Sequence, residues 1–258
     1  MTTNARSIPI LTYHSISSRA GPTSIPADVF KAQMDVLAKT DGDVLSLSEF
    51  LEWHEGKRDA PQGSVVITFD DAFTDFAETA HPILKEHGFP ACVFVPAAHM
   101  GKAEAWHGAD EPARPLMNAK RMKALSGNGI TFGAHSLTHP DLTKLDDDQL
   151  RREVHDSGQV LAEEFGSPTR FFAPPYGYSD ERVRTAIKDS YELSVGVRLG
   201  VADRQSPLFD LPRIEMHYFR DAQKFETFVR GSGSLYFQMR RFARVARLAV
   251  LSILRPGK

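Results

Sequence analysis

This sequence is poor in cysteine and has no excess of positive charge. Its 258 residues include one cysteine, Cys92, so no disulfide can form within the chain. Because Cys92 lies in the apolar run 91–95, we expect its thiol to be buried. The 31 Lys and Arg residues stand against 33 Asp and Glu, a formal net charge of −2. This balance argues against a general nucleic-acid binder, which needs a positive excess to contact phosphates.

Long apolar runs are missing as well. Residues 1–6 (MTTNAR) contain no apolar stretch of signal-peptide length. No segment reaches the roughly 18 apolar residues that a membrane-spanning helix needs. A hydrophobic share of 41% and a charged share of 25% are ordinary for a globular protein that buries a large core. We therefore expect a cytoplasmic protein.

Short apolar runs alternate with helical patterns along the chain, which is typical of α/β proteins with a mainly parallel sheet. Apolar and β-branched runs predict strands at 8–13, 65–69, 91–95, 130–133, 170–173 and 193–197. The spacing of apolar residues predicts helices at 27–40, 75–87, 118–125, 146–165 and 181–190. At least five strand–helix units in one chain favour a (β/α) barrel over an open sheet.

The C-terminal segment differs in composition from the rest. Residues 231–234 (GSGS) indicate a flexible hinge. Residues 235–254 combine four arginines with many apolar side chains, and no acidic residue follows Glu226. A basic amphipathic helix of this kind can lie on an anionic membrane surface or dock on a partner. The alternative is a terminal helix that packs on its own domain with its arginines in water. We therefore divide the chain into a barrel, residues 1–230, and a hinge with a basic amphipathic helix, residues 231–258.

Two adjacent carboxylates, Asp70 and Asp71, follow the predicted strand 65–69. They lie at its C-terminal end, where α/β barrels place their active residues. Because successive side chains leaving a strand point in different directions, one carboxylate could bind a metal while the other moves a proton. The alternative is an acidic turn in which one carboxylate caps the next helix.

Two histidines, His135 and His139, follow the predicted strand 130–133. On a helical turn, a spacing of four residues would place both imidazoles on one face, where they can bind the same ion. A four-residue spacing of two histidines also arises by chance, so the position of the pair at a strand end is the stronger observation. Two histidines and one carboxylate leave coordination positions open for water and substrate, as catalytic sites do. No cysteine lies near this segment, which argues against a structural zinc site.

A third segment, residues 173–177 (APPYG), follows another predicted strand. Pro174 and Pro175 stiffen the turn, and Gly177 permits a backbone angle that other residues avoid. Such a loop can hold a backbone N–H against a developing oxyanion. Taken alone, the segment indicates only a tight turn.

Taken together and in this order, residues 68–71 (TFDD), 135–139 (HSLTH) and 174–177 (PPYG) resemble the polysaccharide deacetylase family, carbohydrate esterase family 4 with NodB homology. The resemblance runs through most of residues 8–225. It implies a distorted (β/α)7-type barrel of the glycoside hydrolase/deacetylase kind. It also implies a metal-dependent hydrolase that removes acyl groups, usually N-acetyl, from amino sugars.

The resemblance also implies roles for the matching residues. Asp70 would be the general base, and Asp71, His135 and His139 would be the metal ligands. The backbone N–H of Tyr176 would help to stabilise the tetrahedral intermediate. Zinc is the metal that these ligands favour, and cobalt, nickel or iron fit the same set. A metal suits the reaction because an amide carbonyl is a poor electrophile.

The sequence departs from the family pattern at position 173. Family members often carry an arginine where Ala173 stands, and that arginine pairs with the base. Residues 211–214 (LPRI) look like a variant of exopolysaccharide-modifying members and offer Arg213 as a replacement; a surface charge is the alternative. For the general acid we predict His217, because residues 214–217 (IEMH) resemble the family's late apolar-then-histidine motif and histidine can donate a proton near neutral pH. His14 could reach the same barrel mouth, and an ordinary strand-end histidine remains the alternative for either.

The expected substrate is an N-acylated amino sugar in a polysaccharide, an oligosaccharide or a lipid-linked glycan. This substrate fits a role in exopolysaccharide or cell-envelope biosynthesis. Through residues 235–254, the protein could contact the inner face of the membrane peripherally. One alternative is an amide hydrolase of the same family that acts on a non-acetyl or small amide. Another is a carbohydrate-binding pseudoenzyme, for which the missing arginine at position 173 is the only support.

Overall fold

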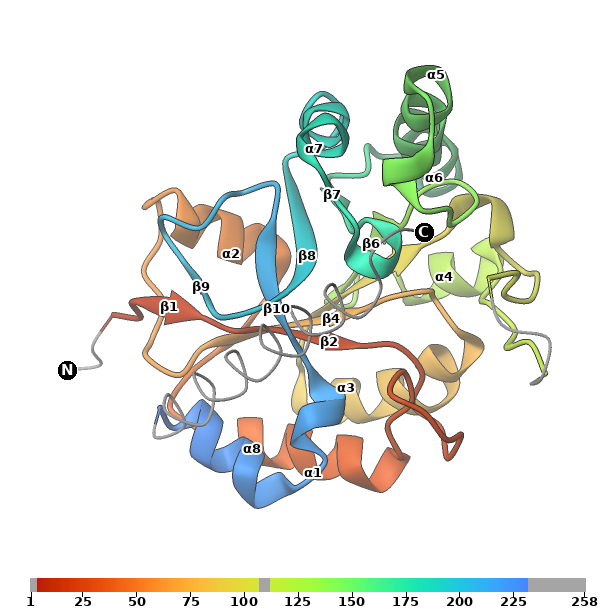
Figure 1. Ribbon diagram of the computed structural model, residues 1–258. Coiled ribbons are helices and arrows are strands. Elements are labelled where there is room, and N and C mark those ends of the chain that lie inside the picture. Colours follow the sequence, from red (N-terminus) through yellow and green to blue (C-terminus); the bar gives the residue numbers. More distant parts are fainter. Residues whose placement is uncertain (1–3, 107–111, 232–258) are drawn as a thin grey trace, which may run out of the picture.

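The computed structural model describes residues 4–106 and 112–231 (Figure 1). Seven parallel strands form a closed barrel in the order β2-β10-β8-β7-β6-β5-β4, and β4 pairs again with β2. The strands are β2 (Ile10–Tyr13), β4 (Val65–Phe69), β5 (Ala91–Val95), β6 (Ile130–Ala134), β7 (Phe171–Phe172), β8 (Leu193–Leu199) and β10 (Leu211–Glu215). The predicted (β/α)7-type barrel is therefore confirmed.

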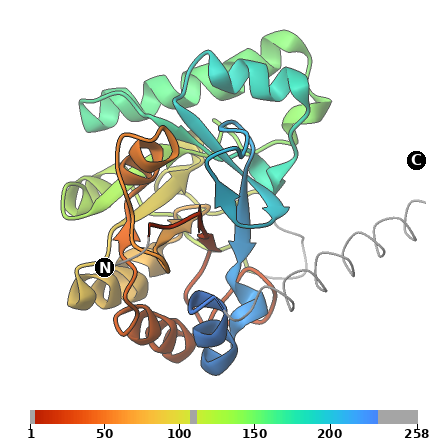
Figure 2. The same ribbon diagram turned by 90° about the vertical axis from the view of Figure 1, so that its left-hand side faces the viewer.

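Helices surround the strands (Figure 2). They are α1 (Ala27–Leu37), α2 (Leu47–His54), α3 (His81–His87), α4 (Ala119–Leu125), α5 (Asp147–Arg151), α6 (Ser157–Phe165), α7 (Glu181–Lys188) and α8 (Ala222–Val229). Two π-helical segments, η1 (Phe76–Ala80) and η4 (Arg152–Asp156), precede α3 and α6. The 3-10 segments are η2 (Ala97–His99), η3 (Leu142–Lys144), η5 (Pro175–Gly177) and η6 (Met216–Phe219).

Local sequence signals explain where several of these elements begin and end. Strands β4 and β5 are buried along their whole length, as expected for apolar runs in a parallel sheet. The side chain of Ser46 and the side chain of Glu49 form a capping box at the start of α2. At the end of α3, Gly88 adopts φ 68°, the left-handed conformation that terminates helices.

The sequence-based element boundaries need some corrections. The predicted strand 8–13 is divided at Pro9 into β1 (Ser7–Ile8) and β2, and β1 pairs instead with β9 (Ala202–Asp203). The predicted helices 75–87 and 146–165 each contain a π-helical segment. Strand β3 (Val44–Leu45), strand β9 and helices α2 and α8 were not predicted, because they are short and contain no long periodic pattern of apolar residues.

Side chains alternate between the inside and the outside of the barrel. On β4, Val65, Ile67 and Phe69 pack against the helices, whereas Val66 belongs to the separate cluster inside the barrel. Ile10 on β2 and Leu211 on β10 belong to this inner cluster too. Because the alternation has a period of two, it carries Asp70, His14 and Arg213 toward the inside at the strands' carboxyl ends. The fold thereby brings together polar residues from distant parts of the chain.

The predicted C-terminal division falls largely outside the described residues. Residues 232–258, and with them the amphipathic segment 235–254, are not among those that the structure describes. The hinge and the membrane contact therefore stay predictions. Within residues 4–106 and 112–231, none of the helices has the length and apolar character needed to span a bilayer.

Candidate active site

A pocket of about 500 Å³ opens at the carboxyl ends of the barrel strands. The strand register explains which side chains reach it. Thr12 pairs with Thr68 across β2 and β4, and Glu215 pairs with Thr12 across β10 and β2. Two residues beyond Thr12 and Thr68 lie His14 and Asp70, on the same inner face. The pocket is lined by every residue predicted for the site: Asp70, Asp71, His135, His139, Tyr176, Arg213, His217 and His14.

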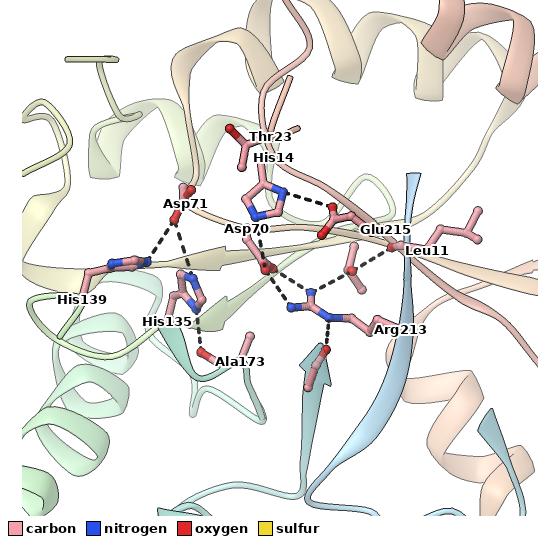
Figure 3. A network of polar contacts seen from close by, with 12 residues as sticks. Leu11, His14, Thr23, Asp70, Asp71, His135, His139, Ala173, Arg213 and Glu215 are labelled. Carbon is pink, nitrogen blue, oxygen red and sulfur yellow. Dashed lines mark hydrogen bonds and ion pairs between the residues drawn. The ribbon is translucent and has the colours of Figure 1, made fainter. Parts of the chain in front are cut away.

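Asp71, His135 and His139 form a buried cluster (Figure 3). The Nε2 atom of His135 lies 3.6 Å from Asp71 Oδ1, and the Nε2 atom of His139 lies 3.3 Å from the same oxygen. One ligand atom from each residue lies within 4.8 Å of the other two. Bonds near 2.1 Å in a tetrahedral site separate ligand atoms by about 3.4 Å. The three residues therefore fit one divalent ion.

The surroundings of the cluster suit a cation. The Nδ1 atom of His135 lies 2.6 Å from the carbonyl oxygen of Ala173, so Nδ1 carries the proton and Nε2 presents its lone pair to Asp71. Burial lowers the pKa of His135 to about 4, which keeps this imidazole neutral. Asp71 Oδ1 is buried and has no hydrogen-bond partner among the described residues. A buried, unsatisfied carboxylate oxygen is costly unless a cation compensates it.

The backbone at these segments is strained. Among the described residues, every non-glycine residue with a positive φ lies in one of the three motifs or directly after one: Asp71 (72°), Ala72 (56°), Ser136 (62°), His139 (65°) and Tyr176 (58°). Such conformations cost about 1–3 kcal/mol each and persist where the surrounding structure imposes them. These strained residues cluster at the pocket, so the backbone is locally least favourable there.

The helical turn predicted for His135 and His139 is wrong. Residues 135–139 form an irregular loop, since the left-handed φ values of Ser136 and His139 are incompatible with a right-handed helix. The hydroxyl of Ser136 accepts a hydrogen bond from the backbone N–H of His139 at 3.0 Å. The two imidazoles still come together, with ring centroids 4.9 Å apart. The loop thus achieves by tertiary structure what the spacing suggested for a helix.

Arg213 forms a buried, two-point ion pair with Asp70. Its Nη1 and Nη2 atoms each donate to one carboxylate oxygen of Asp70 at 2.7 Å, and its Nε donates to the carbonyl of Gly196 at 2.8 Å. The arginine absent at position 173 thus has a counterpart on β10, where Arg213 was predicted to replace it. Ala173 instead supplies its carbonyl to His135.

The same ion pair controls the charge of Asp70. Burial by itself would raise the pKa of Asp70, but the charge and hydrogen bonds of Arg213 outweigh it and hold the pKa far below its ordinary value. Asp70 is therefore an ionised carboxylate that can accept a proton. It lies beside the buried cluster of Asp71, His135 and His139 (Figure 3).

Two further histidines, His14 and His217, line the pocket. His14 Nε2 lies 3.9 Å from Asp70 Oδ2, and His14 Nδ1 lies 3.6 Å from Glu215 Oε1. His217 lies in η6 and also lines the pocket, with its ring 4.1 Å from that of Tyr218. Sequence reasoning missed Glu215. Its position two residues after Arg213 on a strand places both side chains on one face, a signal that could have found it.

Aromatic rings cover His139. Trp106 stacks on its imidazole with centroids 3.9 Å apart, and Tyr176 contacts it edge-on at 4.8 Å. Arg114 forms a bidentate ion pair with buried Glu104, and both contacts are 2.8 Å long. This pair joins the chain segments before and after position 106. Trp106 was not predicted, because a loop tryptophan has no periodic pattern that would indicate its direction.

The family model for polysaccharide deacetylases matches residues 57–191, more than half of the chain. The matched stretch contains the carboxylate pair, the histidine loop and the Pro-Pro-Tyr-Gly turn. The chain belongs to the polysaccharide deacetylase family. The family assignment agrees with the barrel and with the resemblance found in the sequence.

Curated relatives agree with this membership. YxkH of Bacillus subtilis strain 168 is 28% identical over 210 residues, which cover 81% of this chain and 71% of YxkH. The poly-beta-1,6-N-acetyl-D-glucosamine N-deacetylase of Staphylococcus aureus strain MSSA476 is 28% identical over 185 residues. That match covers 68% of this chain and 61% of the staphylococcal protein, so the two are alike over only part of the longer enzyme.

Solved structures show the same barrel. The Streptococcus pyogenes deacetylase PplD, solved in complex with acetate, superposes with a TM-score of 0.71 at 27% identity. That superposition covers 82% of this chain and 92% of PplD. IcaB from Ammonifex degensii superposes with a TM-score of 0.73 at 19% identity, over 91% of this chain and all of IcaB (100%), which supports the fold.

Proposed function

We propose that this polysaccharide deacetylase family member is a metal-dependent hydrolase that removes N-acetyl groups from amino sugars of a glycan. The observation that carries the proposal is the placement of Asp70, paired with Arg213, beside the buried Asp71–His135–His139 cluster in one pocket. The substrate class is supported by the staphylococcal relative, which is named as a poly-N-acetylglucosamine N-deacetylase. The likeness to PplD, a deacetylase solved with acetate, supports the acyl group.

Asp71, His135 and His139 would hold the metal, with zinc favoured by two imidazoles and one carboxylate. When bound, such an ion polarises an amide carbonyl and lowers the pKa of a water molecule. Asp70 then accepts the proton of the attacking water, because Arg213 keeps its carboxylate ionised. Burial of both groups excludes bulk water from this proton transfer. The amide of Tyr176 is proposed to donate to the developing oxyanion.

The departing amine needs a proton, and two residues compete for this role. His217 is the sequence-based prediction. His14 is favoured by a specific geometry, because its two ring nitrogens lie 3.9 Å from Asp70 Oδ2 and 3.6 Å from Glu215 Oε1 in the pocket. Single replacements of each histidine by alanine separate the two. The general acid is the one whose loss removes the basic limb of the kcat/KM profile against pH.

The proposal is tested by acetate release from β-1,6-linked and β-1,4-linked N-acetylglucosamine oligomers. Four samples are compared: zinc-loaded protein, chelated protein, Asp70→Asn, and Asp35→Asn as a control at an exposed carboxylate that pairs with Lys31. Acetate should appear only with zinc, and Asp70→Asn should lower kcat about 10²- to 10⁴-fold while the control keeps its activity.

Other results would favour the alternatives. A protein that binds zinc but releases no acetate, and instead hydrolyses a formyl or small cyclic amide, has the same site with another substrate. A protein that binds the oligomers and zinc but hydrolyses no amide is a carbohydrate-binding pseudoenzyme. If purified wild-type protein binds no divalent metal, the proposal itself is wrong.

A further inference from the structure

The loop between the two histidine ligands depends on an acidic residue of a neighbouring helix. The backbone N–H groups of Leu137 and Thr138 donate to Oε2 of Glu153 at 2.9 and 2.8 Å. The hydroxyl of Thr138 donates to Oε1 of Glu153 at 2.5 Å. One carboxylate thus accepts three hydrogen bonds from two consecutive residues that lie between His135 and His139.

The opposite side of the loop is held by backbone. The carbonyl of Ser136 accepts from the N–H of Ala97 at 3.0 Å, and the carbonyl of Leu137 accepts from the N–H of Ala98 at 2.8 Å. The carbonyl groups of the loop are therefore bonded to the segment that follows β5, whereas two of its N–H groups are bonded to Glu153. Without that carboxylate, two backbone donors beside the metal ligands would lose their partner, which weakens the loop.

The loop needs such support because its backbone is unfavourable. Ser136 and His139 adopt φ values of 62° and 65°, which non-glycine residues rarely adopt. A relaxed loop would move toward a more favourable backbone and turn the His139 imidazole away from Asp71. His139 belongs to no helix or strand, so its position depends on contacts within the loop, such as that with Ser136, and on contacts from outside the loop.

Glu153 is itself held firmly. It belongs to the π-helical segment η4, and π-helical insertions often occur at functional sites. The next residue, Val154, is buried, and its carbonyl accepts hydrogen bonds from the hydroxyls of Ser157 and Tyr191, both at 2.8 Å. These contacts anchor the helix from which the Glu153 side chain reaches the loop.

We infer that Glu153 is a positioning residue of the metal site, which holds His135 and His139 at the separation that a divalent ion requires. The inference rests on the proposed metal site and adds a residue that contacts neither metal nor substrate. Residues that orient metal ligands typically contribute about 10- to 100-fold to metal affinity. The same effect is expected here, because a metal ion that meets preorganised ligand side chains does not have to order the loop on binding.

Two replacements of Glu153 separate hydrogen bonding from simple packing. Glu153→Met keeps the length and the helix-forming tendency of the side chain but cannot accept the two amide hydrogens, whereas Glu153→Gln keeps an acceptor oxygen. The control is Glu164→Met, the same change in α6 at a carboxylate whose ion-pair partner is Lys123, at 2.7 Å. All four full-length proteins are titrated with Zn²⁺ against a chromophoric chelator, and the visible absorption of bound Co²⁺ reports the coordination geometry.

We expect Glu153→Met to bind Zn²⁺ about 10- to 100-fold more weakly and to change the Co²⁺ absorption. Glu153→Gln should recover most of the affinity, and Glu164→Met should match wild type. Wild-type affinity in Glu153→Met, or equal weakening in Glu153→Gln and Glu153→Met, would overturn the role of Glu153. If Glu153→Met does not fold, Thr138→Val, which lacks the hydroxyl donor to Glu153, replaces it in the comparison: weaker Zn²⁺ binding than wild type supports the inference, and unchanged affinity contradicts it. Absence of metal binding in wild type would instead refute the proposed function.

Discussion

Asp70 owes its expected role as a base to one partner, Arg213. A buried carboxylate without a counter-charge would take up a proton, because burial raises its pKa. The two hydrogen bonds from Arg213 reverse this effect, and the folded protein holds Asp70 ionised. Since the folded pKa lies below the unfolded value, the pair stabilises the fold at neutral pH, and this contribution is lost as the pH falls through the folded pKa.

Replacement of Arg213 should therefore change the pH dependence of the reaction. In Arg213→Ala the pKa of Asp70 rises, so the acid limb of the kcat/KM profile moves to higher pH. The unpaired buried carboxylate should also destabilise the protein by about 3–5 kcal/mol. Arg213→Lys keeps the charge but loses the two-point geometry, and should show a smaller shift. Rate profiles against pH and thermal melting measure both effects; an acid limb at the wild-type position in Arg213→Ala would contradict this account.

Tyr178 is expected to contribute to glycan binding rather than to chemistry. Tyr176 and Tyr178 are the exposed large apolar residues of the described chain, at 45% and 54%, and both line the pocket. An aromatic ring at the edge of a glycan site can pack against the apolar face of a sugar. Tyr178→Ala should raise KM for long oligomers about tenfold and leave kcat and the activity on a monosaccharide unchanged. An equal loss on all chain lengths would place Tyr178 at the reacting sugar instead.

Loops at the ends of the barrel strands, rather than the strands themselves, carry the strain of the site. In η5, Gly177 has φ 67° and lies against Val197, so that an added Cβ would meet Val197 Cγ1 at 2.2 Å. Gly88 at the end of α3 has nearly the same φ, 68°, but nothing lies within 4 Å of the position of its Cβ. The two glycines share one backbone requirement and differ only in packing.

This pair of glycines gives a matched test. Gly88→Ala should cost about 1–2 kcal/mol from its backbone conformation alone. Gly177→Ala should cost more, about 2–5 kcal/mol, because overpacking against Val197 is added, and it should displace Tyr176 and reduce activity. The further change Val197→Ala should restore part of the loss. Equal melting temperatures for the two alanine variants would show that the contact with Val197 relaxes freely.

The barrel as a whole should be more stable with metal than without, since a ligand that binds only the folded state stabilises it. At a free Zn²⁺ concentration 100-fold above Kd, the gain is about 2.7 kcal/mol. For a domain of this size, that gain corresponds to a rise in Tm of about 5–10 °C. His139→Ala should abolish the rise, whereas His155→Ala, at an exposed histidine outside the pocket, should keep it. A rise that survives in His139→Ala would place the zinc elsewhere.

Much of the fold and the candidate site could be predicted from the sequence, because the signals are local. Residues 65–69 and 91–95 are strands at their predicted boundaries, since continuous apolar runs in a parallel sheet are buried on both faces. Residue type, spacing and position at strand ends indicated the carboxylate pair and the two histidines, and the resemblance to the family assigned Asp71, His135 and His139 as the metal ligands. The structure brings them within ligand distance of one another. These features depend on neighbours in the chain.

The sequence offered Arg213 as the partner of the base, with a surface charge as the alternative, and only the tertiary structure decided between them. Arg213 lies 143 positions from Asp70 in the chain, and their ion pair forms because β10, β2 and β4 are neighbours in a closed barrel. Glu153 reaches the histidine loop from another helix, and Trp106 reaches His139 from another loop. Local patterns specify which face of an element is apolar, but they do not specify which element lies opposite. The closure of the barrel supplies that information, because the register of its strands determines which inward side chains meet.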